Sequence, residues 1–64
     1  MSEQLLKLER VLEMVGFGSS TVRAWVDEGR FPRPIRVQGR AVRWVRSEVE
    51  QWIADQIAQD RHAA

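Results

Sequence analysis

Apolar residues recur at helical spacing in three stretches of the chain. Within each stretch they fall three, four, seven or eight residues apart, so they share one face of a helix. These faces are the candidate core of the protein. The three faces consist of Leu8, Val11, Leu12 and Val15; of Val22, Trp25 and Val26; and of Val49, Trp52, Ile53 and Ile57.

Residues with known capping preferences mark the ends of these helices. Gly16 is expected to end the first helix in a left-handed conformation. The hydroxyl groups of Ser19–Thr21 supply N-cap chemistry for the second helix, which should end at Gly29. Ser47 stands three residues before Glu50 and predicts a capping box that opens the third helix. That helix is expected to fray from Asp60 onward.

Between the second and third helices the pattern changes from helical to alternating. Pro32 and Pro34 remove backbone donors and favour an extended chain. Ile35–Val37 and Ala41–Trp44 then alternate apolar and basic residues around a turn at Gln38–Arg40, which is the signature of a β-hairpin. We expect the apolar residues to face inward and the arginines to face outward.

The order of elements predicts a mainly α fold with a small β-hairpin: a winged helix-turn-helix with a two-stranded wing and a C-terminal helix. The 64 residues are expected to form one domain over 1–64, with an ordered core of about residues 5–59. A domain of this size removes only about 60% of the surface that its unfolded chain exposes, so it depends on a few large side chains. Trp25, Trp44 and Trp52 are the obvious candidates.

The near-neutral net charge of +1 hides an uneven distribution of charge along the chain. Residues 1–29 carry three basic and five acidic side chains, and residues 47–64 carry one arginine and four acids. Residues 30–46, between them, carry six arginines and no acid. A basic segment flanked by acidic ones is typical of a protein that meets a polyanion with one face.

Composition argues against several other classes of protein. There is no cysteine, and the single histidine, His62, lies in a polar stretch, so we expect neither a disulfide framework nor a metal site. No glycine-rich phosphate loop or nucleophile beside a histidine is present, so we expect no enzyme, cofactor or small-molecule substrate. Met1–Gln4 do not open a signal peptide, and no apolar run could span a membrane, which predicts a cytoplasmic protein.

The second predicted helix carries the candidate base-reading residues. A helix fits the major groove of DNA, and residues near its N-terminus can reach base edges, which makes Ser19, Ser20, Thr21 and Arg23 the candidates. The first turn also offers free backbone N–H groups to a phosphate. Two alternatives stay open: the serines only cap the helix, or Arg23 pairs with Asp27 on the protein surface.

The predicted hairpin carries the candidate wing contacts. Arginine has a planar guanidinium group that suits phosphate and can enter a narrow minor groove, as a wing beside a reading helix would. The alternative is that these charges only protect an edge strand from aggregation. The candidate contacts are Arg33, Arg36, Gln38, Arg40 and Arg43, with Arg40 at the tip of the turn.

Three separated groups of residues, in order, resemble the AlpA family of prophage regulators. They are Leu12–Phe17 with Ser20–Val22 and Glu28–Pro34, then Gly39–Trp44, then Ser47–Ile53. The similarity covers about residues 6 to 57, nearly the whole chain. One departure lies at Gly18 and Ser19, where the family usually has a serine followed by a basic residue.

The resemblance implies a winged helix-turn-helix of the excisionase and MerR-like type, with the second helix in the major groove and the wing on the adjacent backbone or minor groove. It also implies a regulator of prophage genes or an excisionase that directs an integrase. The expected partner is double-stranded DNA, together with an integrase or a second copy bound on DNA. The alternative from another class is a protein-interaction module whose arginine face and third-helix stripe dock an acidic partner such as an integrase.

Overall fold

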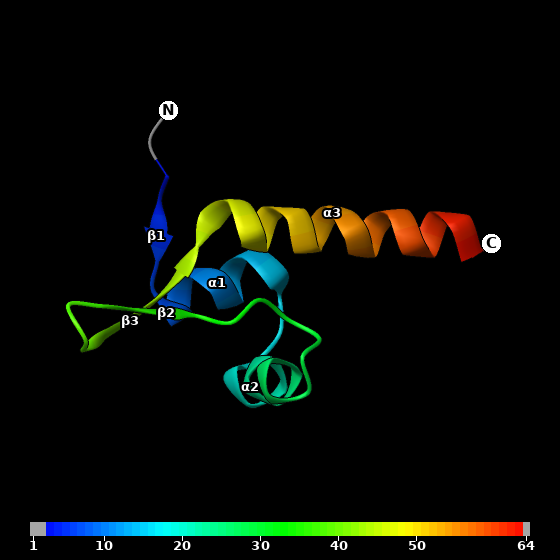
Figure 1. Ribbon diagram of the computed structural model, residues 1–64. Coiled ribbons are helices and arrows are strands. Elements are labelled where there is room, and N and C mark those ends of the chain that lie inside the picture. The colour runs from blue at the N-terminus through cyan, green and yellow to red at the C-terminus, as the bar shows by residue number, and fades with distance from the viewer. Residues whose placement is uncertain (1–2, 64) are drawn as a thin grey trace.

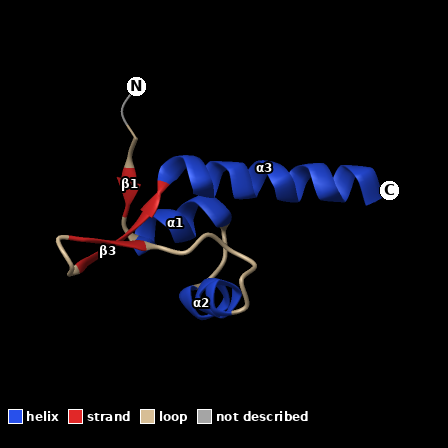
Figure 2. Cartoon of the chain, viewed as in Figure 1, coloured by secondary structure: helices blue, strands red, loops and turns tan. Residues whose placement is uncertain are grey.

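The computed structural model describes residues 3–63, and the side chains as far as Arg61. Helices α1 (Leu8–Val15) and α2 (Ser19–Asp27) lie below α3 (Arg46–Ala63) in the view of Figure 1, and the hairpin of β2 and β3 extends to one side as a wing (Figure 1, Figure 2). The protein is mainly α with a β-hairpin wing, which confirms the predicted winged helix-turn-helix. In chain order the elements are β1 (Leu5–Leu6), α1 (Leu8–Val15), α2 (Ser19–Asp27), β2 (Ile35–Val37), β3 (Ala41–Val45) and α3 (Arg46–Ala63).

The sheet has three strands in the order β1-β3-β2: β2 and β3 form the predicted two-stranded wing, and β1 is a strand that the sequence did not predict. The additional strand, β1, pairs antiparallel with β3, with Leu5 opposite Val45 and Leu6 opposite Trp44. Two leucines have no alternation that could reveal a strand in the sequence. The pairing covers the outer edge of β3 and buries Leu6 in the core.

The hairpin forms at the predicted residues, but its two faces differ from the prediction. The register places Ile35 opposite Arg43 and Arg36 opposite Val42, so each of these pairs shares a face of the sheet. Apolar and basic residues are therefore mixed on both faces. Ile35 and Val42 remain exposed, because the hairpin extends beyond the body and has no second layer to cover it.

Glycines set the turns between these elements. Gly16 ends α1 at a φ of 78°, and its N–H donates to Leu12 O, which confirms the predicted left-handed cap. Gly29 has a φ of 76° just after α2, and the N–H of Arg30 donates to the carbonyl of Trp25 at 2.7 Å, as in a Schellman motif. At the wing tip both Gln38 and Gly39 have positive φ.

Helix α2 begins without the predicted serine cap. Gly18 is the N-cap residue, no side chain caps the helix, and Ser19 is already helical. The hydroxyl groups of Ser19 and Ser20 thus make no capping bond, and the alternative that the serines only cap the helix is wrong. The N–H groups of the first turn have no capping side chain in front of them.

The start of α3 also differs from the prediction. Ser47 donates its hydroxyl to Glu3 Oε2 at 3.0 Å and its N–H to Glu3 Oε1 at 3.3 Å, across 44 residues of sequence. Glu50 instead accepts from Arg46 Nε at 2.9 Å. The predicted capping box is therefore wrong, since an acid ahead of β1 caps the helix from outside. Helix α3 extends to Ala63, past the Asp60 at which the sequence predicts that fraying begins.

The core lies where the three helices meet the sheet. Its fully covered helical members are Val11, Val22 and Val49, one from each predicted apolar face. The predictions are confirmed except at Ile57, which the third face included and which is exposed. Of the tryptophans only Trp44 is buried, whereas Trp25 and Trp52 are half-buried and pack against this cluster. The other buried residues are Leu6 and Phe31.

Two tryptophan side chains attach the loop between α2 and β2 to the body. Trp44 donates its indole N–H to the carbonyl of Pro32 at 2.9 Å, and Trp52 donates to the carbonyl of Arg30 at 2.7 Å. Phe31 lies between these two anchors and contacts the Trp52 ring edge-on at 4.8 Å between centroids. The loop therefore holds a fixed path between the second helix and the wing.

Candidate nucleic-acid interface

Helix α2 presents a polar ridge to solvent. Successive residues of a helix are rotated by about 100°, so the buried Val22 defines the inner side and Ser20, Ala24 and Asp27 fall on the opposite side. Arg23 is also exposed and lies on the flank of this ridge. Ser20, Arg23 and Asp27 occupy successive turns, so the ridge runs the full length of the helix.

A groove between α2 and the sheet joins this ridge to the wing. We call it the helix–sheet groove; it has a volume of about 450 Å³. Arg23 and Asp27 form its α2 side, and Val42 of β3 and Pro34 form its other side. Helix α2 and the root of the wing therefore share one surface. The groove is lined by Leu8, Arg23, Val26, Asp27, Pro34, Val42 and Trp44.

The wing arginines divide between the two faces of the sheet. Arg36 lies opposite Val42, on the face that includes the helix–sheet groove, and its side chain is exposed. Arg43 lies on the other face with Ile35, is half-buried, and donates to the carbonyl of Val42 at 2.8 Å. Arg36 is therefore on the same side of the molecule as Arg23, whereas Arg43 lies on the opposite face of the sheet.

The remaining candidates are all accessible. Gln38 and Arg40 stand in the exposed turn at the wing tip, and Arg33 is exposed in the loop before β2. Thr21 is exposed on the flank of α2 that faces away from Arg23, whereas Ser19 is half-buried. The structure thus places the candidates over α2, the loop and the wing, and of these candidates only Arg23 lines the helix–sheet groove.

Ion pairs reduce the basic field that the sequence predicts. Arg30 pairs with Glu28 at 3.3 Å and Arg46 with Glu50 at 2.9 Å, so two of the six arginines have acidic partners. Arg46 also donates to Gln4 Oε1 and belongs to the start of α3. Among residues 3–61 none of the other four, nor Arg23, forms a salt bridge, so the alternative of an Arg23–Asp27 pair is not realised.

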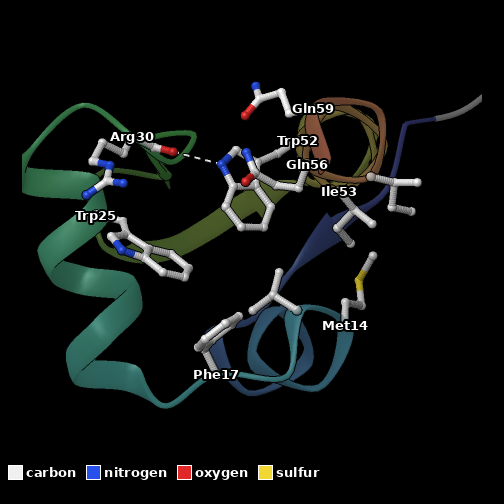
Figure 3. A pocket seen from close by; sticks show the side chains of 10 residues that line it. Met14, Phe17, Trp25, Arg30, Trp52, Ile53, Gln56 and Gln59 are labelled. Carbon is white, nitrogen blue, oxygen red and sulfur yellow. Dashed lines mark hydrogen bonds between the residues drawn. The ribbon is translucent and has the colours of Figure 1, made fainter. Parts of the chain in front are cut away.

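A second groove lies on another side of the molecule, between α1, α2 and α3 (Figure 3). We call it the aromatic groove; its volume is about 540 Å³. Trp25 and Trp52 form its floor with ring centroids 5.5 Å apart, and Phe17 packs edge-on against Trp25. Phe17 is 50% exposed and Ile57, which also lines the groove, is 46% exposed.

Two other features are missing from the part of the chain that the structure describes. Within the described residues, no cluster of histidine and acidic side chains could hold a metal ion. No helix in that part of the chain is both long and apolar enough to cross a membrane. The side chain of His62 lies outside the described residues.

Sequence patterns located the arginines of this surface but missed its other members. Val42 and Pro34 line the helix–sheet groove, although alternation in the wing assigned Val42 to the core. The helical spacing of Arg23 and Asp27 predicts only a pair between these two, yet Asp27 stands on the ridge without an ion pair to any described residue. The sequence did carry one signal for Asp27, because it is an acid close to the basic candidate Arg23.

An exposed helix that shares one surface with a basic β-wing defines a winged helix-turn-helix protein. The chain matches the model of the family described as "Prophage CP4-57 regulatory protein (AlpA)" over residues 4–57, and it belongs to that family. It is also 34% identical over 56 residues to the uncharacterized protein ORF88 of Enterobacteria phage P4. That alignment covers 88% of this chain and 64% of the phage protein, so the chain spans less than two thirds of its relative. No solved structure matches the chain.

Proposed function

We propose that the protein binds double-stranded DNA in a sequence-specific way, with α2 in the major groove and the wing on the adjacent backbone or minor groove. The observation that carries this proposal is the shared surface around the helix–sheet groove, where Arg23 and Arg36 lie on one side of the molecule without a salt bridge to any described residue. Arginines without acidic partners are free to neutralise phosphate.

Each part of the surface has its own role in this proposal. Ser20 and Arg23 reach base edges from the ridge of α2, and Ser19 and Thr21 lie in the first turn, where backbone N–H groups can hold a phosphate. Arg33 and Arg36 contact the backbone beside the major groove. Gln38, Arg40 and Arg43 contact DNA through the wing.

We propose that the biological role is regulation of prophage or mobile-element genes, excision of the element, or both. A recombination directionality factor and a transcription regulator need the same DNA surface, and family membership supports the regulatory role. In either role the protein acts without catalysis or a cofactor and works in the cytoplasm, where its DNA is.

The direct test is a footprint of the protein across the promoter and attachment region neighbouring its gene. Protection of a defined site at a concentration that leaves random duplex unprotected supports the proposal. Bending of a site beside an integrase site, measured by circular permutation of the fragment, supports the excisionase role. Equal protection along the whole fragment would contradict sequence-specific binding.

A second candidate function is contact with another protein on DNA, and the aromatic groove favours it. The third-helix stripe is not available as a whole, since Val49 is buried and Trp52 and Ile53 pack against the core. Phe17 and Ile57 remain exposed at the groove and could meet an integrase or a second copy. Ile57→Gln should then weaken cooperative binding to adjacent sites while leaving affinity for a single site unchanged. Unchanged cooperativity, with or without the integrase, would contradict this candidate.

A further inference from the structure

Asp27 is the acidic side chain of the helix–sheet groove, whose other charged lining residue is Arg23. It is the last residue of α2, it is exposed, and it lines the helix–sheet groove together with Arg23. Ser20, Arg23 and Asp27 follow one another along the ridge that the proposed function places in the major groove. A carboxylate here would stand close to the DNA.

Folding does not explain why an acid occupies this position. The negative end of the helix dipole lies at the C-terminus of α2, where a carboxylate is unfavourable. Asp27 forms no salt bridge with Arg23 or with any other residue of the described chain, and no hydrogen bond of its carboxylate is found there. The acid thus stands at the unfavourable end of the helix dipole, without a salt bridge or a hydrogen bond to the described residues.

Binding to the phosphate backbone does not explain it either. A carboxylate beside phosphates repels them and weakens binding to every duplex alike. The groups on DNA that attract a carboxylate are the amino groups on the base edges of the major groove. An acid on a reading helix is therefore useful only where it meets such a donor.

Cytosine offers the better donor of the two available amino groups. Its N4 amino group donates into the major groove, and aspartate pairs with it as an acceptor. The N6 amino group of adenine lies beside N7, which is itself an acceptor and repels a carboxylate. We propose, on the basis of the proposed function, that Asp27 is a specificity-determining residue that accepts a hydrogen bond from the N4 amino group of a cytosine.

The geometry of the ridge also places this cytosine within the binding site. Asp27 stands seven positions after Ser20, which is roughly 10 Å along the helix, or about three base-pair steps of DNA. Asp27 therefore reads a base pair near one end of the α2 footprint, about three steps from the pair that Ser20 faces. The required cytosine should occur once in each binding site.

The test compares wild-type protein with Asp27→Ala and Asp27→Asn in selection from a library of randomised duplexes, read by sequencing. Wild type should select cytosine at one position, and Asp27→Ala should lose only that preference, by roughly 5- to 150-fold. Asp27→Asn should change the preference at that position from cytosine to adenine, because an amide can pair with both N6 and N7 of adenine. Both variants should bind random duplex more tightly, because one negative charge is removed.

Asp60→Asn on α3 is the matched control, since it removes the same charge from an exposed helix away from this surface. It should leave every base preference unchanged. If both Asp27 variants bind all duplexes more tightly but keep the wild-type preference at every position, Asp27 is a repulsive charge only and the inference is wrong. A wild-type protein that selects no sequence would contradict the proposed function itself, before any variant is compared.

Discussion

The six arginines of residues 30–46 differ in what their side chains contact. Arg30 and Arg46 have carboxylate partners and belong to the ends of helices, whereas Arg33, Arg36 and Arg40 are exposed without a salt bridge. Among described residues Arg23 is also unpaired, although an acid stands four residues later on the same helix. Exposed ion pairs contribute little to stability. An arginine without an acidic partner has no ion pair to give up when it binds a phosphate, so the unpaired arginines are the better candidates for DNA contacts.

The first prediction at this scale concerns the reading helix. Arg23→Ala should reduce the discrimination between the specific site and random DNA by about 1 to 3 kcal/mol, because a base-edge contact is lost. The measurement is a pair of titrations by fluorescence anisotropy at one salt concentration, with Arg61→Ala as the control. An equal loss on both duplexes would instead make Arg23 a phosphate contact.

The second concerns the wing tip. Arg40→Ala should weaken binding to all duplexes alike and lower the slope of log affinity against log salt by about 1, because one phosphate contact is removed. A loss that is larger on sites with a narrow A·T-rich minor groove would place the side chain in that groove instead. Wild-type affinity together with a wild-type salt slope would exclude the wing tip from binding.

At the scale of elements, α3 depends on residues at the other end of the chain. Its first turn is capped by Glu3, and the N–H of Arg46 donates to the carbonyl of Gln4 at 2.8 Å. The strand that follows these residues, β1, pairs with β3, which leads directly into α3. The N-terminal segment thus holds both the edge of the sheet and the start of the last helix.

Removal of the Glu3 cap should lower the free energy of unfolding by a measurable amount. Glu3→Ala should lower the free energy of unfolding by about 0.5 to 2 kcal/mol, the range for removal of an N-cap acceptor. Urea unfolding followed by circular dichroism measures the change. Ser47→Ala should cost less, because the backbone N–H of residue 47 can still donate to Glu3. A Glu3→Ala protein as stable as wild type would show that water replaces the carboxylate at no cost.

At the scale of the whole molecule, a small set of aromatic contacts joins the parts. Trp52 packs against Trp25 of α2 and Phe31 of the loop, and its indole N–H holds the carbonyl of Arg30. Trp52 therefore connects α3 both to α2 and to the loop between α2 and β2. In a domain this small, such a residue carries a large share of the stability.

Trp52→Ala should unfold the domain or leave it only partly folded. Truncation of a buried tryptophan costs about 3 to 5 kcal/mol, and a domain of this size has about that much stability. Because Trp52 is only half-buried, the lower end of that range applies. Thermal melting followed by circular dichroism is the measurement, with Trp52→Phe as the conservative control. A cooperative melt with nearly the wild-type midpoint would contradict this role.

The sequence by itself determined the three helices, the hairpin, the turns at Gly16 and Gly29, and the basic segment between two acidic ones. These features depend on periodicity and on backbone preferences within a few residues, so they can be read locally. It also located most members of the candidate interface, because their charge is visible in the sequence.

Only the tertiary structure decided which residues meet across long separations in the chain. Glu3 replaces the local capping box because the pairing of β1 with β3 brings it to Ser47, 44 residues away. The position of Arg36 beside the helix–sheet groove, with Arg43 on the opposite face, follows from strand register and from the packing of α2 against the sheet. Register and packing depend on contacts between distant segments, and no local pattern in the chain encodes them.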